Sequence, residues 1–543
     1  MDTVRERPVF SVGAGMYAEA VDLKIYATSG KVIFTRDGTV PMAGKAEEWK
    51  SVLKITKNTV IRARVVVKGK VAGPVVTASY FIGEKVSVPV FSIAVAPDSF
   101  FAPVGGIYAQ YLDELETEAH FEFFEPGKGK VFEADAGFMV TGGESITLLK
   151  KSLRVSARKK YGSSVFDYSF FPGLDILPMK GFFLRADALL GTHHTKLAGE
   201  RLRNELIYAF NKEMGNHVDI QAIRHVALYI NGEYWGLYSL IERKNKDFIR
   251  THYGFTDIDL MANEDLEIVS GNDSDFVSLL HFMNSTNLDL PENWERLNRW
   301  VDMENFTDYW VLNTFCGLFD YGVNVRWWRP RTAEGKWRWI SIDNDSWDEP
   351  EHEFFTEMYD HTTARGVYML GKMLRSERFK KIFLNRLSDC MNSVFLPENF
   401  SRLIVEIQSG IKEELERDRM RWEGLINYVP AGIEAINLLD YAKERPENLN
   451  VEIIDALNLS GTCKLSLNVE PQGAGSLFLN SIHPTKFPWT GSYFKGIELN
   501  LKALPEAGFV FDHWRGGVQS GENPIAFIPG DKEILTAVFR KSP

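Results

Sequence analysis

One stretch of sequence carries the pattern that decides the fold: DYGVN (320–324), VRWWRPRTAEGKWRWISI (325–342) and DND (343–345). VRWW and WRWISI have the β-branched and aromatic residues of strands, and the turn-forming RTAEGK lies between them. This order predicts a β-hairpin. The preceding segment, Asn305 to Phe319, is largely apolar, and its aromatic residues recur at mixed steps of three and four. That spacing favours a buried helix.

The hairpin predicts a cluster of polar side chains at its open end. With the turn centred between residues 333 and 334, Asn324 would stand opposite Asp343, and opposed side chains lie about 5 Å apart. Asp320, just before the hairpin, and Asp345, just after it, would join them. Three carboxylates and an amide form a suitable site for a hard cation such as Mg²⁺. An ordinary solvated acidic turn is the competing interpretation, because the chain is acidic overall.

Composition sets wider limits on the function. The chain has 543 residues and a net charge of −11, which argues against a nucleic-acid partner, since such proteins carry basic surfaces. No apolar run reaches the eighteen or so residues of a membrane span, and the first residues, MDTVRERPVF, lack the apolar core of a signal peptide. The cysteines, Cys316, Cys390 and Cys463, are too far apart to suggest a disulfide framework or a zinc site.

Both ends of the chain read as β structure. Residues 1–85 contain short strand-like runs such as VIFTRDG and TVIRARVVV, separated by turns, which predicts a β-sandwich. Their order resembles the immunoglobulin-like module found at the ends of chitobiases and hexosaminidases. Residues 461–543 again alternate over short strands, and GFVFDHWRGG resembles a divergent repeat module of bacterial surface proteins. Such modules imply attachment to a cell-surface polysaccharide or protein.

Residues 86–460 mix helices and strands, and two motifs there predict a phosphate site. LLKKSLRVS predicts a strand carrying Lys150 and Lys151, for which a phosphate contact and a solvated basic face are equally open. HVALYINGEYWGLYSLIERKN predicts a hairpin about its Asn-Gly turn. Glu242 ends this hairpin, where a connector that binds a nucleotide could run.

The ordered motifs of the central region resemble the spore-coat CotH kinase family. They are GGES, KKSLRV, RLRNELIYAF, YINGEYWGLYSLIERKNKDFI, DMENFTDYWVLN, DYGVN and KWRWISIDND. The resemblance implies an α+β, atypical protein-kinase-like fold that uses ATP and Mg²⁺ to phosphorylate a protein. In this interpretation Asp320 is catalytic, Asp343, Asn324 and Asp345 hold the metal, and Lys150, Lys151 and Glu242 bind the nucleotide.

Two positions depart from the family pattern. Thr141 stands where the family usually has an arginine, and Asn344 stands where an aromatic residue is frequent. The first departure bears on phosphate binding, and neither removes a carboxylate.

Other functions fit the same sequence. The chain could be a non-catalytic surface adhesin built on a kinase-like fold, or an enzyme that transfers AMP or another group. A carbohydrate-active enzyme is suggested by thirteen tryptophans and by the chitobiase-like start. We expect a secreted or cell-surface protein of several domains, and a cytoplasmic location stays open.

Overall fold

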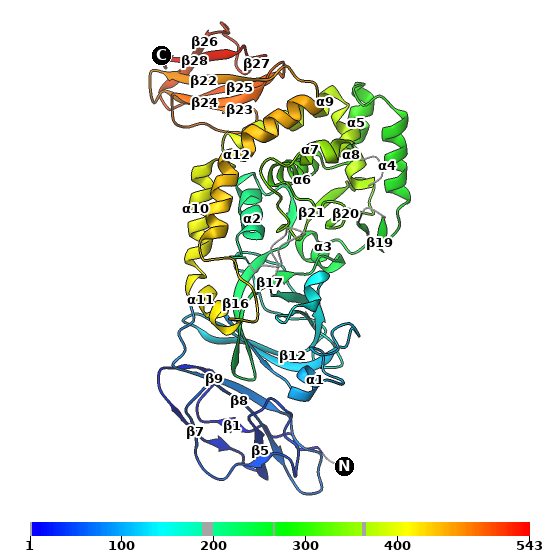
Figure 1. Cartoon of the computed structure of the whole chain (residues 1–543), viewed down its shortest axis with the longest axis vertical. Coiled ribbons are helices and arrows are strands. Elements are labelled where there is room, and N and C mark those ends of the chain that lie inside the picture. The colour runs from blue at the N-terminus through cyan, green and yellow to red at the C-terminus, as the bar shows by residue number, and fades with distance from the viewer. Residues whose placement is uncertain (1–2, 187–198, 264–265, 361–364) are drawn as a thin grey trace.

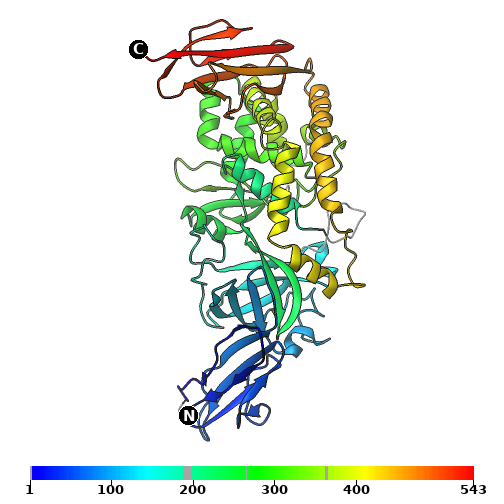
Figure 2. The same cartoon turned by 90° about the vertical axis from the view of Figure 1, so that its left-hand side faces the viewer.

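The structure is a computed structural model that describes residues 3–186, 199–263, 266–360 and 365–543. The molecule is elongated, and its two termini lie at opposite ends (Figures 1 and 2). A β-rich region at each end flanks a central region of mixed α and β structure. This arrangement agrees with the predicted multidomain chain. The RLRNELIYAF motif falls largely on α2 (Arg203–Glu213).

The N-terminal region is built of short strands around a small apolar core. In β8 the alternating pattern turns Ile61 and Ala63 toward the core, which also contains Phe34 and Tyr80. Successive side chains of a strand point to opposite faces, and Val60 and Arg62 on the other face of β8 are buried as well. The strands are β1 (Val9–Phe10), β2 (Gly15–Tyr17), β3 (Val21–Leu23), β4 (Ile25–Tyr26), β5 (Lys31–Thr35), β6 (Glu47–Glu48), β7 (Leu53–Ile55), β8 (Thr59–Val66) and β9 (Val76–Ile82).

The first half of the central region is a closed barrel with strand order β10-β11-β12-β13-β14-β17-β16. Its interior is filled by phenyl rings, among them Phe91, Phe121, Phe170 and Phe182, so the barrel is a packed core. The strands are β10 (Val90–Ala94), β11 (Thr117–Glu125), β12 (Gly129–Thr141), β13 (Ser152–Ser156), β14 (Gly181–Arg185), β16 (Ile223–Ile230) and β17 (Glu233–Glu242). A short helix, α1 (Pro97–Phe101), and a 3-10 turn, η1 (Glu144–Thr147), connect them.

The predicted hairpin around Asn231 and Gly232 is confirmed as β16 and β17. Both turn residues have positive φ, 52° and 85°, as a tight two-residue hairpin turn requires. Asn231 also exchanges hydrogen bonds with the backbone of Val95, which ties the turn to the end of β10.

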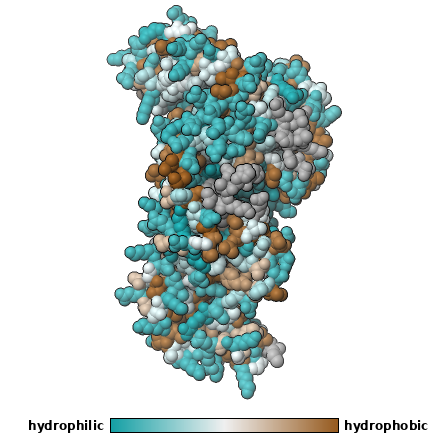
Figure 3. All heavy atoms as spheres, viewed as in Figure 1, coloured by the Kyte–Doolittle hydropathy of each residue, from teal (hydrophilic) through white to brown (hydrophobic). Residues whose placement is uncertain are grey.

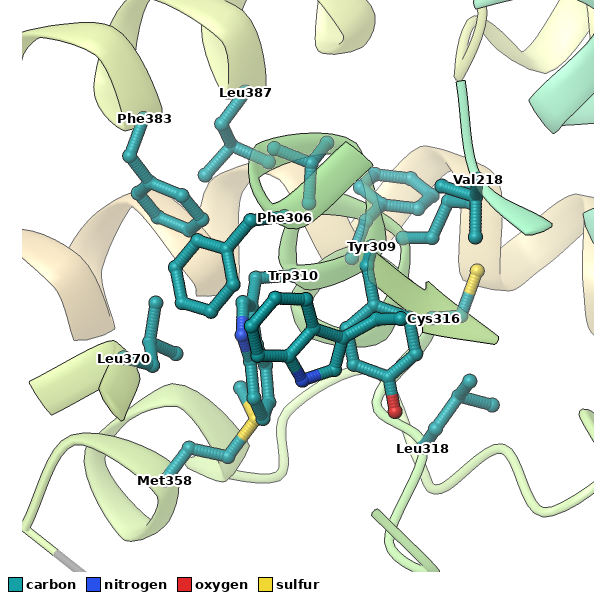
Figure 4. Close-up of a cluster of buried hydrophobic side chains, with 14 of the residues drawn as sticks. Val218, Phe306, Tyr309, Trp310, Cys316, Leu318, Met358, Leu370, Phe383 and Leu387 are labelled. Carbon is teal, nitrogen blue, oxygen red and sulfur yellow. The ribbon is translucent and has the colours of Figure 1, made fainter. Parts of the chain in front are cut away.

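The second half of the central region surrounds another sheet, with strand order β15-β21-β20-β18-β19. Its strands are β15 (Asp219–Ile220), β18 (Ile258–Ala262), β19 (Glu267–Ser270), β20 (Val325–Pro330) and β21 (Arg338–Ser341). The predicted apolar helix is α6 (Met303–Cys316), and every residue from Asn305 to Cys316 is buried. Figure 4 shows why: Phe306, Tyr309 and Trp310 point in different directions into apolar neighbours from several elements.

The register of the β20–β21 hairpin differs from the prediction. Trp327 pairs with Trp339, and Val325 pairs with Ser341, where the ladder ends. The predicted pairing of Asn324 with Asp343 is therefore wrong by one residue. A shift of one residue reverses the face on which a side chain lies, so the two groups do not meet as a cross-strand pair.

Helices cover this sheet and lead to the C-terminal region. Helices make up most of residues 365–456, and the last of them, α12 (Ile433–Ala456), carries the chain toward the C-terminal strands (Figure 1). The remaining helices are α3 (Lys246–Tyr253), α4 (Ser274–Ser285), α5 (Pro291–Trp300), α7 (Phe354–Asp360), α8 (Arg365–Leu374), α9 (Glu377–Met391), α10 (Pro397–Ser409) and α11 (Lys412–Arg421).

The C-terminal region consists of two sheets around a core that includes Trp514, which is fully buried. Its strands are β22 (Thr462–Glu470), β23 (Gly475–Leu479), β24 (Trp489–Phe494), β25 (Leu499–Pro505), β26 (Phe509–Gly516), β27 (Ile525–Phe527) and β28 (Lys532–Lys541). Hydrophilic residues dominate the face in Figure 3, where hydrophobic residues gather in separate patches. Within the described residues, no helix combines the length and the apolar character needed to cross a membrane. Cys316, Cys390 and Cys463 are buried free thiols.

Candidate functional site

A cavity of about 320 Å³ lies between the outer wall of the barrel and the second sheet. The barrel contributes side chains from the neighbouring strands β12, β13, β14 and β17, and the other wall comes from segments near β15 and β21. The lining residues are Thr141, Gly142, Gly143, Ser145, Ser152, Phe183, Arg185, Gln221, Ile241, Lys244 and Asp343.

Strand register gives this cavity two chemically different ends. Phe183 of β14 pairs with Ile241 of β17, and these two side chains form an apolar end. Arg185 lies two residues farther along β14, beside Ser152 of β13. The Ser152 hydroxyl accepts a hydrogen bond from the backbone N–H of Ala186, the residue after Arg185. Thr141 pairs with Ser152. The cavity therefore runs from an apolar wall to a polar, cationic one.

A glycine turn closes the polar end. Gly142 has φ of 146°, and a Cβ there would come within 2.7 Å of the Ser145 hydroxyl, so the tight turn requires glycine. At Gly143 a Cβ would meet nothing within 4 Å. The backbone of Gly143 is consequently open to a ligand, as in loops that approach phosphate closely.

Charged groups meet at the polar end. Arg185 forms ion pairs with both Asp343 and Asp345, and it is the group that draws these carboxylates together. Burial tends to raise the pKa of Asp343, but the charges of Arg185 and Lys244 outweigh it and lower this pKa below its ordinary value. Asp343 is therefore a carboxylate at neutral pH. Burial lowers the pKa of Lys244, although Asp343 opposes that effect.

Asp320 and Asn324 form a second pair. The Asn324 amide donates to the Asp320 carboxylate at 3.3 Å, and the Asn324 backbone N–H donates to the Asp320 carbonyl at 2.8 Å. The Phe319 N–H donates to the Ser346 carbonyl at 3.2 Å, so the two backbone segments run side by side at this point. Asp320 and Asp345, the next residues along these segments, therefore lie next to each other. The four predicted residues thus lie in one region. They form two pairs, Asp320 with Asn324 and Asp343 with Asp345, and the adjacent backbone segments bring the pairs together.

The loop that carries these carboxylates is held by Asn344, the residue that departs from the family pattern. Its side chain accepts a hydrogen bond from Ser341 at 2.7 Å, and its backbone N–H donates to Asn204 at 2.8 Å. The Trp347 indole donates to the Asn344 carbonyl at 2.9 Å. Asn344 therefore serves the shape of the loop.

These groups fit a hard cation in chemistry. Carboxylate and amide oxygens are the ligands Mg²⁺ prefers, and the Oδ1 atom of Asp343 is held by charge without a well-formed hydrogen bond. Within the described residues, however, no three His, Cys, Asp or Glu side chains converge as a ready-made metal site. Asp343 and Asp345 are the residues that could hold the ion, with Asn324 and Asp320 beside them.

The structure places Lys150 and Lys151 away from the cavity. Both precede β13, which begins at Ser152, so the predicted strand location is wrong. The Lys150 ammonium is buried and bonds to the Asp418 carboxylate at 2.7 and 2.9 Å. The Lys151 ammonium donates to the carbonyls of Ile146 and Leu148 and lies 3.8 Å from the centroid of the Tyr111 ring.

Glu242 is buried at the end of β17 behind the cavity. Its carboxylate accepts a hydrogen bond from the Ala222 N–H at 2.9 Å and contacts His252 Nε2 at 2.9 and 3.0 Å. Its backbone carbonyl accepts from the Gln221 amide. Glu242 thus positions the segment that lines the apolar end, and its side chain is not among the lining groups.

The sequence analysis singled out few of the lining residues, and the charged or amide side chains that it missed are Arg185, Gln221 and Lys244. Arg185 ends a short strand and Lys244 follows the hairpin by two residues, which are signals too common to single out. The Gly142–Gly143 pair was a usable signal, and the cavity includes both residues.

Comparison with family models gives one relevant match. The model described as CotH kinase protein matches residues 139–449, which is more than half of the chain and includes the whole cavity. A comparison with curated proteins gives no significant match.

Proposed function

The chain belongs to the CotH kinase protein family, and from this premise we propose that it is an atypical, Mg²⁺-dependent protein kinase. In the proposed reaction the γ-phosphoryl group of ATP passes to a Ser or Thr hydroxyl of a protein. The observation that carries the proposal is the two-ended cavity, in which an apolar wall faces a glycine turn, two cations and Asp343.

The polar end of the cavity supplies groups for the phosphates. Arg185 and Lys244 would balance phosphate charge, and the open backbone at Gly143 would let an oxygen approach closely. These cations serve where the family's usual arginine is replaced by Thr141. They also take over the role that the sequence predicted for Lys150 and Lys151, whose ammonium groups are engaged elsewhere.

Asp343 and Asp345 would hold Mg²⁺, with Asn324 as a further oxygen ligand. When bound, the ion neutralises charge on the phosphate oxygens during transfer. Arg185 pairs with both carboxylates, so its guanidinium must give up part of that contact to the ion and turn toward phosphate. Arg185 would thereby keep two like charges together before a metal arrives.

Asp320 would orient the acceptor hydroxyl and take up its proton. Asp320 lies on a backbone segment next to Asp345, which brings it near the transfer site. The Asn324 amide donates a hydrogen bond to the Asp320 carboxylate and so orients it. General-base help of this kind needs a carboxylate within hydrogen-bond reach of the hydroxyl. Transfer of AMP in place of phosphate would use the same groups with the nucleotide reversed.

A non-catalytic scaffold is the second candidate, and one observation favours it. Arg185 pairs with both Asp343 and Asp345, and Lys244 supplies a second positive charge near Asp343, so the charges of the two carboxylates are offset without a metal. For either function, we propose that the partner is a secreted or cell-surface protein, and that the two β-rich ends attach the molecule to a surface protein or polysaccharide.

Calorimetric titration of ATP into the full chain, with and without Mg²⁺, tests the proposal. We expect Mg²⁺-dependent binding in the wild type and its loss in Asp343→Ala. A site that binds no nucleotide under either condition would instead support the scaffold. Transfer is then checked with γ-labelled ATP and candidate surface proteins as acceptors.

A further inference from the structure

Gln221 occupies a special position in the cavity. It lies between β15 (Asp219–Ile220) and β16 (Ile223–Ile230), where the chain passes from the second sheet into the barrel. Its side chain is 8 % exposed and lines the cavity. Hydrogen bonds between Ala222 and Glu242 place it next to the end of β17, and the register of β16 and β17 puts it two residues beyond the Phe183–Ile241 pair, on the side away from Arg185. Gln221 is thus the uncharged polar side chain at the apolar end.

The orientation of the Gln221 amide follows from its partner. Its Nε2 donates to the backbone carbonyl of Glu242, and a carbonyl can accept but never donate, so the nitrogen must face Glu242. Glu242 is itself fixed by Ala222 and His252. Among the described residues, no hydrogen bond is made to Gln221 Oε1. A positioned acceptor is therefore left for a ligand at this end.

The spacing of the two ends suits a nucleotide. Phe183 and Arg185 lie two residues apart on β14, which is about 7 Å along an extended strand. That length is comparable to a ribose between a base and its first phosphate. With the phosphates at Arg185 and the glycine turn, the base lies against Phe183 and Ile241, and its edge faces Gln221.

We propose that Gln221 selects the base, and that it accepts a hydrogen bond from an amino group at position 6 of a purine. This inference rests on the proposed function, which supplies the nucleotide. An adenine base presents an N–H donor at this position, whereas guanine and hypoxanthine present a carbonyl. Two facing acceptors repel, and a buried polar atom left without a partner weakens binding.

Binding of matched nucleotides to the full chain tests the assignment. ATP and inosine triphosphate differ in the group at position 6, an amino group in one and a carbonyl in the other, and purine riboside triphosphate has neither. We expect Mg²⁺-ATP to bind about tenfold or more tightly than either analogue, since one hydrogen bond to a buried partner is involved. Gln221→Met has nearly the same volume and should reduce ATP affinity to the level of the analogues.

The outcomes separate this inference from the proposed function. If the wild type prefers ATP and Gln221→Met keeps that preference, another group reads the base and the assignment is wrong. If the wild type binds all three nucleotides equally, position 6 is not read and the assignment is also wrong. If no triphosphate binds, the proposed function itself fails. The analogue comparison needs no variant, so it stands even if Gln221→Met does not fold.

Discussion

At the scale of single residues, Asp343 holds a backbone conformation that few side chains adopt. Its φ is 55°, in the left-handed region, where a residue with a Cβ loses about 1 kcal/mol or more. Such strain persists where surrounding contacts hold it, and it gathers at functional sites. Here Arg185 and Lys244 stabilise the carboxylate in return. The strained backbone conformation therefore supports a functional role for Asp343.

Replacing Asp343 or Asp320 by asparagine should impair different steps, ATP binding in the first case and phosphate transfer alone in the second. Asp343→Asn should abolish Mg²⁺-dependent ATP binding and lower transfer on the order of a hundredfold or more, since the metal charge is lost. Asp320→Asn should bind ATP within about threefold of the wild type and still fail to transfer phosphate. Calorimetry and a phosphotransfer assay measure the two effects. Equal loss of binding in both variants would contradict the separate roles.

Lys150 should matter for stability and little for nucleotide binding. It forms a buried ion pair with Asp418, and removing one member of such a pair costs about 3 kcal/mol or more because a charge is left unpaired. Lys150→Met should therefore lower the free energy of unfolding by that amount, as measured in urea.

Asp418→Asn provides the matched control for this pair. The double variant should be less destabilised than the sum of the two single variants, because no isolated charge is left buried. ATP affinity should stay near that of the wild type in whatever fraction is folded. A specific loss of ATP binding without loss of stability would restore the phosphate role expected from the sequence.

At the scale of elements, the strands of the β20–β21 hairpin could be predicted from the sequence, but their register could not. Alternating tryptophans predicted both strands, and the two strands are there. The register depended on the centre of the turn, where Gly335 bonds back to Thr332 and the pairing places Ala333 at the midpoint. A turn centred on one residue and a turn centred between two residues give strand pairings that differ by one position. Asn324 therefore does not stand opposite Asp343, and its amide contacts Asp320 within the turn before β20.

α6 is fixed to its neighbours by a charged cluster that should respond to pH. His217 Nδ1 contacts Asp308 of α6 at 2.8 Å, and Arg386 of α9 bonds to the same carboxylate. The hydrogen bond to Asp308 raises the pKa of His217 above its ordinary 6.5, against a smaller opposing effect of burial. Glu304 adds to the increase and Arg386 opposes it.

The sign of the resulting pH dependence follows from the raised pKa. Folding favours protonated His217, so this stabilisation is full below pH 6.5 and is lost as pH rises through the higher pKa of the folded state. His217→Gln should therefore show a smaller loss of unfolding free energy between pH 6 and 8 than the wild type. Urea denaturation across this range measures the slopes, and identical slopes would rule out His217 as the cause.

At the scale of the whole molecule, polar contacts join both β-rich ends to the centre, partly buried at the N-terminal side and buried at the C-terminal side. At the N-terminal side, Glu84 accepts from Arg417 of α11 at 2.7 Å and from Tyr229 of β16 at 3.0 Å. At the C-terminal side, Asp389 of α9 is fully buried and accepts from Ser481 and Tyr493. Such contacts favour one fixed arrangement over loosely tethered modules.

Asp389 should control how firmly the C-terminal region is held. Asp389→Ala leaves the donors of Ser481 and Tyr493 without their partner, which costs about 3 kcal/mol. We expect faster cleavage by trypsin near the junction of α12 and β22, with ATP affinity unchanged. Ser466→Ala, at an exposed hydroxyl pair within the C-terminal strands, is a control that should leave cleavage unaltered. Unchanged cleavage in Asp389→Ala would show that other contacts hold the region.

The sequence alone predicted the β-rich ends, the buried helix α6, the strands of both hairpins and the carboxylates proposed to hold a metal. Each depends on local spacing or on a short motif, so a few neighbouring residues contain the information. The tertiary structure decided which cation meets which carboxylate: Arg185 lies 160 residues from Asp345, and Lys150 lies 268 residues from Asp418. Charge attracts any opposite charge without regard to sequence, so the partner of each group is set by where the barrel and the second sheet bring their edges together.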